Sequence, residues 1–289
     1  MEFAQLISEP FAYGFMQRAL VGCSALSLGA APLGVFLMLR RLSLTGDAMA
    51  HALFPGVALG YLVAGLSVPA MTIGGVIAGL LVAVLAGIVA RTTAAREDAS
   101  LAAFYLISLA AGVAIISSQG SSVDLLRVLF GTVLALDDDS LMLIAGVTSL
   151  TLLVMAVILR GLIAECVDPA FMRTVSRAGG WIHMIFLGLV VLNLVGGFQA
   201  LGTLMVVGIM ILPGAAARFW VRSISSMLVL AIAFGWVASV AGLLLSYYVD
   251  AASGPMVILA AGGIYVISLL FGRVDGYIIS LLPRKHLHA

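Results

Sequence analysis

Long apolar stretches dominate this sequence, and each reaches or approaches the length that a helix needs to cross a lipid bilayer. About 30 Å of hydrocarbon requires roughly 20 apolar residues in a helix. Inside lipid every backbone polar group must be satisfied locally, so such stretches fold as helices. The expected helices lie at residues 16–39, 44–65, 68–90, 100–119, 141–160, 181–196, 199–217, 227–248 and 255–272. The sequence therefore predicts an all-α, polytopic transmembrane helical bundle.

The number of spans depends on the sixth and seventh stretches, which are short and are separated only by Gly196, Gly197 and Phe198. Read as two helices they give nine spans, and read as one broken hairpin they give eight. No Ser/Gly/Pro-rich linker and no obvious internal repeat divides the chain. We therefore expect residues 1–289 to form a single transmembrane domain.

The composition excludes several classes of protein. Charged residues make up 9% of the chain and hydrophobic residues 63%, whereas soluble domains carry about 25% charged residues. So few charges could not cover a globule of this size against water, which excludes a soluble enzyme, a secreted disulfide scaffold and a disordered regulator. The 14 basic and 13 acidic residues nearly balance, so no basic surface indicates a nucleic-acid partner. The lipid bilayer is the partner that composition predicts.

The distribution of arginine and lysine predicts which ends of the helices face the cytoplasm. Cytoplasmic loops of membrane proteins carry an excess of these residues. Here they gather at alternate junctions between the expected helices, at residues 40–41, 91–96, 160–177, 218–222 and 273–285. We expect these junctions to be cytoplasmic, with the N-terminus outside and the C-terminus inside.

Two segments between the expected spans carry patterns of their own. Residues 124–139 hold an apolar run bounded by acids that is too short to span the bilayer, so they form either a surface-lying or re-entrant helix or an ordinary amphipathic outer loop. Residues 164–180 predict a short cytoplasmic helix that begins with an N-capping Asp–Pro pair and ends at a glycine. The helix pattern is carried by Asp168, Pro169, Phe171, Met172, Arg173, Arg177 and Gly179. It is either a surface-lying connector or a knob that docks in a partner's groove.

Asp47 is the charged residue that does not fit a junction, because it falls just inside the second expected span. His51 follows four residues later, so a helix places both side chains on one face about 6 Å apart at their bases. A charge at bilayer depth costs on the order of 2.5–3.5 kcal/mol by insertion scales, and such residues usually face a cavity and serve function. The alternative is that Asp47 caps the helix N-terminus and His51 is an ordinary interior histidine.

A carboxylate paired with a neutral imidazole indicates a particular class of metal ion. The pair suits Mn, Fe(II) or Zn better than Mg or Ca, which prefer oxygen, and better than Cu(I), which prefers sulfur. Asp47 and His51 alone supply only half of the ligands of such a metal site. A second copy of the helix across a dimer axis would raise the ligand number to four.

Other polar residues of the expected spans leave alternatives open. His183 is either an interfacial residue or a further ligand, and the histidines at 286 and 288 belong to a solvated tail. Asn193 and Gln199 either line the outer part of a pore or hydrogen-bond helices together. Glycines at positions such as 29, 34, 74, 196, 197 and 214 are expected to let helices approach closely.

Four stretches of the sequence resemble a known family: GVFLMLRRLSLTGDAMAHALFPGVALG, DPAFMRTVSRAGG, FQALGTLMVVGIMILPGAAARFW and LSYYVDAASGP. In order and spacing they are similar to the permease subunits of the manganese, zinc and iron ABC importers. The resemblance covers nearly the whole chain, and GDAMAHALFPG is its most specific motif.

This resemblance implies a function and a set of partners. Permeases of the family work as a dimer of two copies or two related chains, bind cytoplasmic ABC ATPase subunits, and receive metal from an extracytoplasmic metal-binding protein. The family's metal path falls on Asp47 and His51, and its coupling segment falls on residues 168–180. The implied protein imports Mn, Zn or Fe(II) across the bacterial cytoplasmic (inner) membrane by ATP-driven alternating access. It carries the ion as cargo and holds no covalently bound cofactor.

The chain is expected to be a transport subunit rather than an enzyme. A P-loop needs G-K-[S/T], whereas Lys285 is the only lysine and follows Arg284, so an ATPase would be a separate polypeptide. No histidine is followed by glutamate, which excludes the H-E-x-x-H motif of metalloproteases. The alternative function is a proton-coupled secondary metal transporter, in which Asp47 and His51 relay protons.

Overall fold

Helices account for all the regular secondary structure that the computed structural model describes, which covers residues 9–65, 67–92, 97–118, 133, 136–167, 178–274 and 276–281. A short 3-10 helix, η1 (Pro10–Ala12), precedes α2 (Gly14–Leu39), and the remaining helices follow in chain order. They are α3 (Ser43–Ala52), α4 (Phe54–Ala64), α5 (Val68–Thr92), α6 (Glu97–Ser118), α8 (Asp138–Val167), α10 (Ala178–Leu201), α11 (Thr203–Arg218), α12 (Ile224–Val249), α13 (Ser253–Phe271) and α14 (Tyr277–Leu281). The prediction of an all-helical bundle is confirmed.

Each apolar stretch expected to span the membrane contains a helix of this fold. By length and hydropathy, seven helical segments of the described residues can cross a bilayer. Two shorter apolar helices, Ala99–Ile115 and Thr203–Arg218, occupy the other two expected positions. The second segment differs from expectation because it is broken at Leu53 into α3 and α4.

The turn expected at residues 196–198 is wrong, since these residues continue α10 and the chain turns at Gly202 instead. Gly202 has φ 90°, a conformation that glycine adopts without the steric cost of a Cβ. The side chain of Val147 lies 3.1 Å from the place of a Cβ on Gly196, and that of Val206 lies 2.5 Å from the place of one on Gly197. The two earlier glycines therefore serve helix packing rather than chain reversal.

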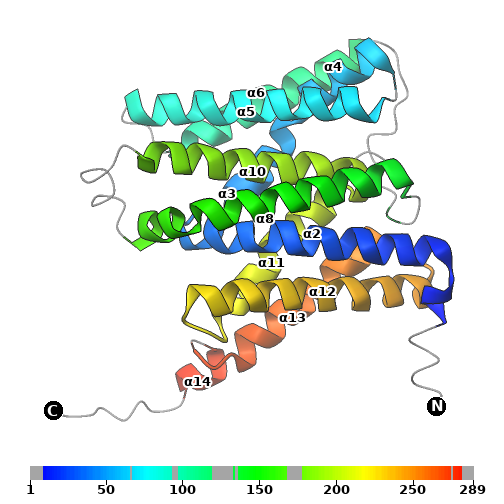
Figure 1. The fold of residues 1–289 in the computed structure, drawn as a ribbon, viewed down its shortest axis with the longest axis vertical. Coiled ribbons are helices and arrows are strands. Elements are labelled where there is room, and N and C mark those ends of the chain that lie inside the picture. Colours follow the sequence, from blue (N-terminus) through cyan, green and yellow to red (C-terminus); the bar gives the residue numbers. More distant parts are fainter. Residues whose placement is uncertain are drawn as a thin grey trace.

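The helices lie side by side in three groups (Figure 1). α4, α5 and α6 form one side, α11, α12 and α13 form the other, and α2, α8 and α10 lie between them. α2 packs against α8, α11 and α12, and α10 packs against α5, α8 and α11. η1 and α14 lie at opposite ends of the bundle.

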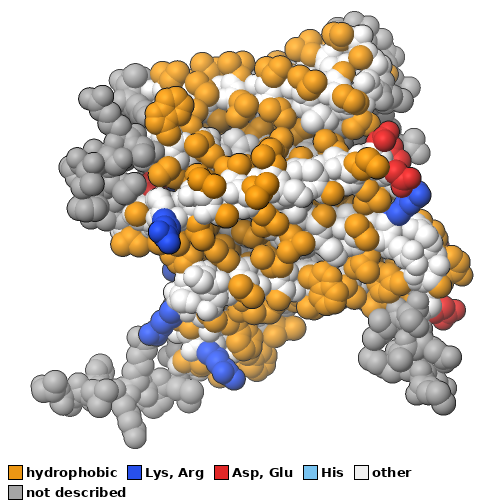
Figure 2. Space-filling model, in the orientation of Figure 1, with side chains coloured by type: hydrophobic (Ala, Val, Ile, Leu, Met, Phe, Trp, Pro, Cys, Tyr) orange, Lys and Arg blue, Asp and Glu red, His pale blue; other side chains and the backbone are white. Residues whose placement is uncertain are grey.

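The surface divides into an apolar middle and charged ends. On the face shown in Figure 2, hydrophobic side chains cover the length of the helices, while most acidic side chains gather at one end and most basic ones at the other. At the acidic end Asp137 precedes α8, and its carboxylate accepts a hydrogen bond of 3.0 Å from the Ser140 amide. Hydrogen bonds from Ser140 hold the pKa of Asp137 below its ordinary value. This charge distribution suits a bundle that crosses a bilayer.

Close helix crossings depend on glycines at two places. On α2, the place of a Cβ on Gly34 is filled by the carbonyl of Met210 from α11, and on α11 a Cβ on Gly214 would lie 3.0 Å from the Val35 amide nitrogen. Gly56 of α4 and Gly74 of α5 meet backbone to backbone in the same way. Small residues at such contacts let helices pack where lipid gives no hydrophobic drive for association.

We predict that Gly34→Ala destabilises the bundle, because a methyl group there displaces backbone rather than a flexible side chain. Overpacking of this kind costs about 1–3 kcal/mol or more. The matched control is Gly146→Ala on α8, where a Cβ meets nothing within 4 Å and helix propensity gains about 0.5–1 kcal/mol. Thermal unfolding in detergent measures both variants. Equal melting temperatures for the two would contradict the contact.

Asn193 joins two helices of the middle group. Its side-chain amide donates hydrogen bonds to the Thr151 hydroxyl of α8 at 2.7 Å and to the Leu189 carbonyl at 2.9 Å. Asn193 is 1% exposed and Thr151 is fully buried. Of the two roles considered for Asn193, the geometry supports the joining of helices. The side chain of Gln199 lies outside the described residues.

α2 and α8 run in the same direction and are joined by an ion pair at each end. At the end where both begin, Arg18 lies 3.1 Å from Asp138, with both side chains at least half exposed. Where both end, Arg40 lies 2.9 Å from Glu165, with side-chain exposures of only 12% and 13%. The Arg40 guanidinium also lies over the Phe186 ring, 5.5 Å from its centroid. The second pair is therefore desolvated and the first is not.

We predict that Glu165→Ala destabilises the protein by about 3–5 kcal/mol, since it leaves the buried Arg40 charge without compensation. The matched control is Asp138→Ala, which removes an exposed pair worth about 0–1 kcal/mol. Unfolding of the reconstituted protein by denaturant gives both free energies. If the two variants lost equal stability, burial would not distinguish the pairs.

Candidate metal site

A tight turn after α2 positions the helix that carries the two expected metal ligands. Arg41 takes φ 60°, and the amide of Leu42 donates to the Leu37 carbonyl at 2.7 Å while that of Arg41 donates to Met38 at 3.0 Å. This bond pattern ends a helix with a left-handed residue. α3 starts at Ser43 directly afterwards, with Leu42 as its N-cap. Asp47 therefore lies one turn inside α3 and does not cap it, so the capping interpretation is wrong.

Asp47 and His51 lie together on α3. The Nε2 atom of His51 is 3.8 Å from Oδ1 of Asp47. The Asp47 side chain is 62% exposed and that of His51 31%. His51 Nδ1 is buried and has no hydrogen-bond partner within the described part of the chain. Both Asp47 oxygens and the Nε2 lone pair can thus turn toward one cation.

The helix breaks directly after this pair because of Pro55. A proline lacks the amide hydrogen that would bond the carbonyl four residues earlier, here that of His51, and its ring clashes with that carbonyl. α3 ends at Ala52 and α4 starts at Phe54. The Ser108 hydroxyl of α6 donates to the Ala52 carbonyl at 2.8 Å. A polar side chain from another helix thus satisfies a backbone group at the break.

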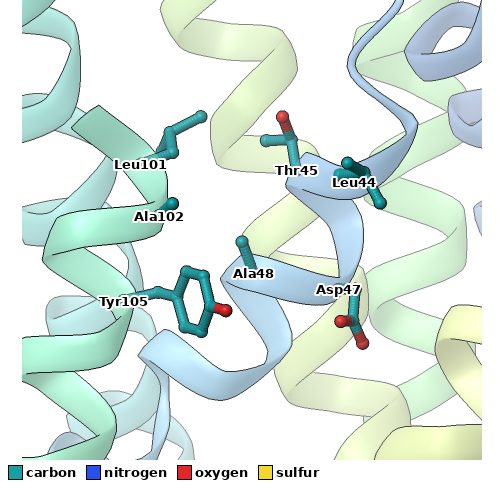
Figure 3. A pocket seen from close by; sticks show the side chains of 7 residues that line it. All are labelled: Leu44, Thr45, Asp47, Ala48, Leu101, Ala102 and Tyr105. Carbon is teal, nitrogen blue, oxygen red and sulfur yellow. The ribbon is translucent and has the colours of Figure 1, made fainter. Parts of the chain in front are cut away.

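A cavity of about 170 Å³ lies beside Asp47, between α3 and α6. It is lined by Leu44, Thr45, Asp47, Ala48, Leu101, Ala102 and Tyr105. Figure 3 shows the Tyr105 ring extending from α6 toward α3, and the Asp47 carboxylate projecting from α3 on the side away from Leu101. The Thr45 hydroxyl is buried without a hydrogen-bond partner among the described residues. Oxygen atoms of three kinds, carboxylate, hydroxyl and phenol, are available along this helix pair.

One face of the broken segment lies open in the single chain. Leu44 is 78% exposed and Leu59 51%, and Asp47, His51 and Pro55 lie between them at helical spacing. The opposite face is covered, with Met49 and Ala52 fully buried against the rest of the bundle. Asp47 therefore lies on a helix face that the described residues leave largely uncovered and that borders the cavity, with His51 at its partly covered side.

The other residues considered from the sequence do not join this pair. Among the described residues no group of three or more His, Cys, Asp or Glu side chains is close enough to hold a metal ion. His183 is buried in α10 at 8% exposure. Several expected features lie outside the described residues: residues 168–177 of the coupling helix, residues 124–132 and 134–135 of the outer segment, and the histidines at 286 and 288. Gly179, expected to end the coupling helix, lies in the first turn of α10.

Sequence reasoning missed the aromatic neighbour that α6 contributes to His51. Tyr105 and Phe54 place their rings 6.3 Å from the His51 ring. Phe54 belongs to the recognised motif, but Tyr105 is more than 50 residues away along the chain. A single aromatic residue in an apolar stretch carries no signal for such a contact. Only the packing of α6 on α3 reveals it.

The chain is similar to known transport proteins over almost its whole length. The ABC 3 transport family matches residues 12–272. The chain is 32% identical to the chelated iron transport system membrane protein YfeD of Yersinia pestis, over 93% of this chain and 89% of YfeD. It is 30% identical to the manganese transport system membrane protein MntC of Halalkalibacterium halodurans, over 95% of this chain and 91% of MntC.

The fold is also similar to that of a solved structure, PsaBC from Streptococcus pneumoniae in complex with Fab. The TM-score is 0.83 at 30% sequence identity, and the match covers 96% of this chain and 99% of the other. These comparisons confirm the family resemblance that the GDAMAHALFPG motif and its companions indicated. The chain is a multi-pass membrane protein that belongs to the ABC 3 transport family.

Proposed function

We propose that this protein is the membrane permease subunit of an ABC importer for a divalent first-row metal ion, Mn, Fe(II) or Zn. The observation that carries the proposal is the Asp47–His51 pair, a carboxylate and an imidazole 3.8 Å apart on the open face of a membrane-length segment. Names of the relatives support manganese and iron as cargo. Zinc is compatible with the same donors.

In this proposal Asp47 supplies the negative charge that compensates a cation stripped of water, and His51 supplies a nitrogen donor that favours borderline metals over Mg and Ca. The two side chains give half of a coordination shell. A second permease subunit, identical or related, would cover the open face between Leu44 and Leu59 and bring a second pair. Covering this face also removes a carboxylate from lipid, where it would cost on the order of 2.5–3.5 kcal/mol.

The proposal includes partners on both sides of the inner membrane. An extracytoplasmic metal-binding protein would deliver the ion between the two permeases, and cytoplasmic ATPase subunits would drive alternating access. We place the coupling segment at residues 168–180, directly after the end of α8 in the sequence. We propose nine spans, because η1 and α14 lie at opposite ends of the bundle (Figure 1), as an odd number of crossings requires. The N-terminus is then outside and the C-terminus inside.

We predict that Asp47→Ala abolishes metal uptake while the transporter still assembles. Loss of a ligand should cost at least as much as the loss of a residue that only supports a ligand, which is roughly 10–100-fold. Uptake of radioactive manganese into proteoliposomes holding the assembled transporter measures the effect. Asp139→Ala is the matched control, since Asp139 is exposed at the start of α8. Normal uptake by the Asp47 variant would remove the site assignment.

The source of energy separates this proposal from a proton-coupled secondary transporter. We predict no uptake by the protein reconstituted without its ATPase, with or without an imposed pH gradient, and uptake when ATPase, binding protein and ATP are supplied. Metal entry driven by the pH gradient alone would favour the rival function. In that case Asp47 and His51 would act as a proton relay.

A further inference from the structure

The imidazole of His51 lies against two aromatic rings that come from different helices. Phe54, at the start of α4, has its ring centroid 6.3 Å from that of His51, with 29° between the planes. Tyr105 of α6 lies at the same centroid distance with 32° between the planes. Phe54 is itself held by an edge contact of 6.0 Å with Phe198 of α10. The histidine ring is therefore confined by neighbours that are packed in turn.

Among the described residues no side chain or carbonyl accepts a hydrogen bond from the second ring nitrogen of His51. Metal-binding histidines almost always donate the hydrogen of the second ring nitrogen to a carboxylate, a carbonyl or water. In the described part of the chain His51 Nδ1 is buried without any hydrogen-bond partner, while Nε2 faces Asp47 at 3.8 Å. Within this part of the chain the contacts with the Phe54 and Tyr105 rings restrict the angle of the imidazole.

The position of Tyr105 is set by the packing of α6 on α3 and α4. One turn further along the same face, Ser108 donates its hydroxyl hydrogen to the Ala52 carbonyl. A turn beyond that, a Cβ on Gly112 would lie 2.9 Å from the Pro55 nitrogen, so the two backbones touch there. These contacts anchor α6 on both sides of the helix break. The backbone of α6 that carries Tyr105 is therefore held in place where the Tyr105 ring contacts His51.

Tyr105 also lines the cavity beside Asp47. In Figure 3 its ring extends across this space toward α3. The same ring therefore contacts the imidazole and borders the space next to the carboxylate. Of the described residues that line this cavity, Tyr105 is the aromatic one.

We propose that Tyr105 is a positioning residue that holds the imidazole of His51 with Nε2 directed at Asp47, so that the two metal donors are arranged before the ion arrives. It acts through the face of its ring, and the phenol oxygen is not needed. The inference rests on the proposed function, because it concerns the same metal site. It adds α6 to the elements that determine metal affinity.

The test measures metal binding by the full-length protein in lipid nanodiscs, with Mn²⁺ as the probe for affinity and Co²⁺ as the spectroscopic probe. We expect Tyr105→Leu to weaken Mn²⁺ binding roughly two- to tenfold, the range of a lost aromatic contact. Tyr105→Phe keeps the ring and should bind as the unchanged protein does. Tyr265→Leu is the matched control, because it removes a contact of similar length with Phe219, at 6.0 Å, outside the site. It should leave the affinity unchanged.

Spectroscopy separates positioning from general loss of structure. The visible absorption of bound Co²⁺ reports the geometry of its ligands, and we expect it to change in Tyr105→Leu and to be retained in Tyr105→Phe. Tyr105→Met provides a second ring-free variant if the leucine variant does not fold. A Phe variant as weak as the Leu variant would show that the hydroxyl acts instead and would overturn the proposal.

Asp47→Ala, measured in the same way, tells the two proposals apart. If it loses Mn²⁺ binding while both ring-free variants bind normally, the metal site stands and the role of Tyr105 is refuted. If Asp47→Ala itself binds Mn²⁺ normally, the site is elsewhere and the proposed function fails with it.

Discussion

The hydrocarbon interior of a bilayer offers no water to polar groups, and this constraint explains the buried polar contacts of the bundle. The carbonyl at the end of α3 accepts a hydrogen bond from Ser108, the Asn193 amide bonds Thr151 and its own helix, and the Arg40 charge lies against Glu165. While both partners are present, each of these contacts changes the free energy of unfolding little. Removing one partner leaves a buried polar group unpaired and destabilises the protein strongly. Asp47 departs from this pattern, because a carboxylate on a membrane-length segment is more than half exposed.

In the proposed function, this departure marks the α3 face as the metal site rather than a packing surface. An uncovered carboxylate in lipid raises the free energy of the folded protein. A chain that places Asp47 and His51 on one open face beside a cavity requires something to cover them. In the proposed function a metal ion and a second permease together cover this face, whereas either alone would leave charge or apolar area exposed.

The sequence predicted the helical fold well because membrane helices are determined by local composition, and every expected apolar stretch contains a helix. It also predicted that Asp47 and His51 share a face, since that depends only on helical spacing. It misplaced the turn before α11, because Gly196 and Gly197 resemble turn residues until their neighbours Val147 and Val206 are seen. The contact of Tyr105 with His51 joins two segments that are distant in the sequence. Local sequence patterns do not predict such contacts. The break at Leu53 follows from Pro55, and the position of this proline in the sequence could have predicted it.

The parallel arrangement of α2 and α8 restricts how the transporter can change shape. Sliding one helix along the other by a turn, about 5.4 Å, would separate the pairs Arg18–Asp138 and Arg40–Glu165 at the same time. These two helices should therefore travel as one rigid body. Relative motion is left to helix boundaries without ion pairs among the described residues.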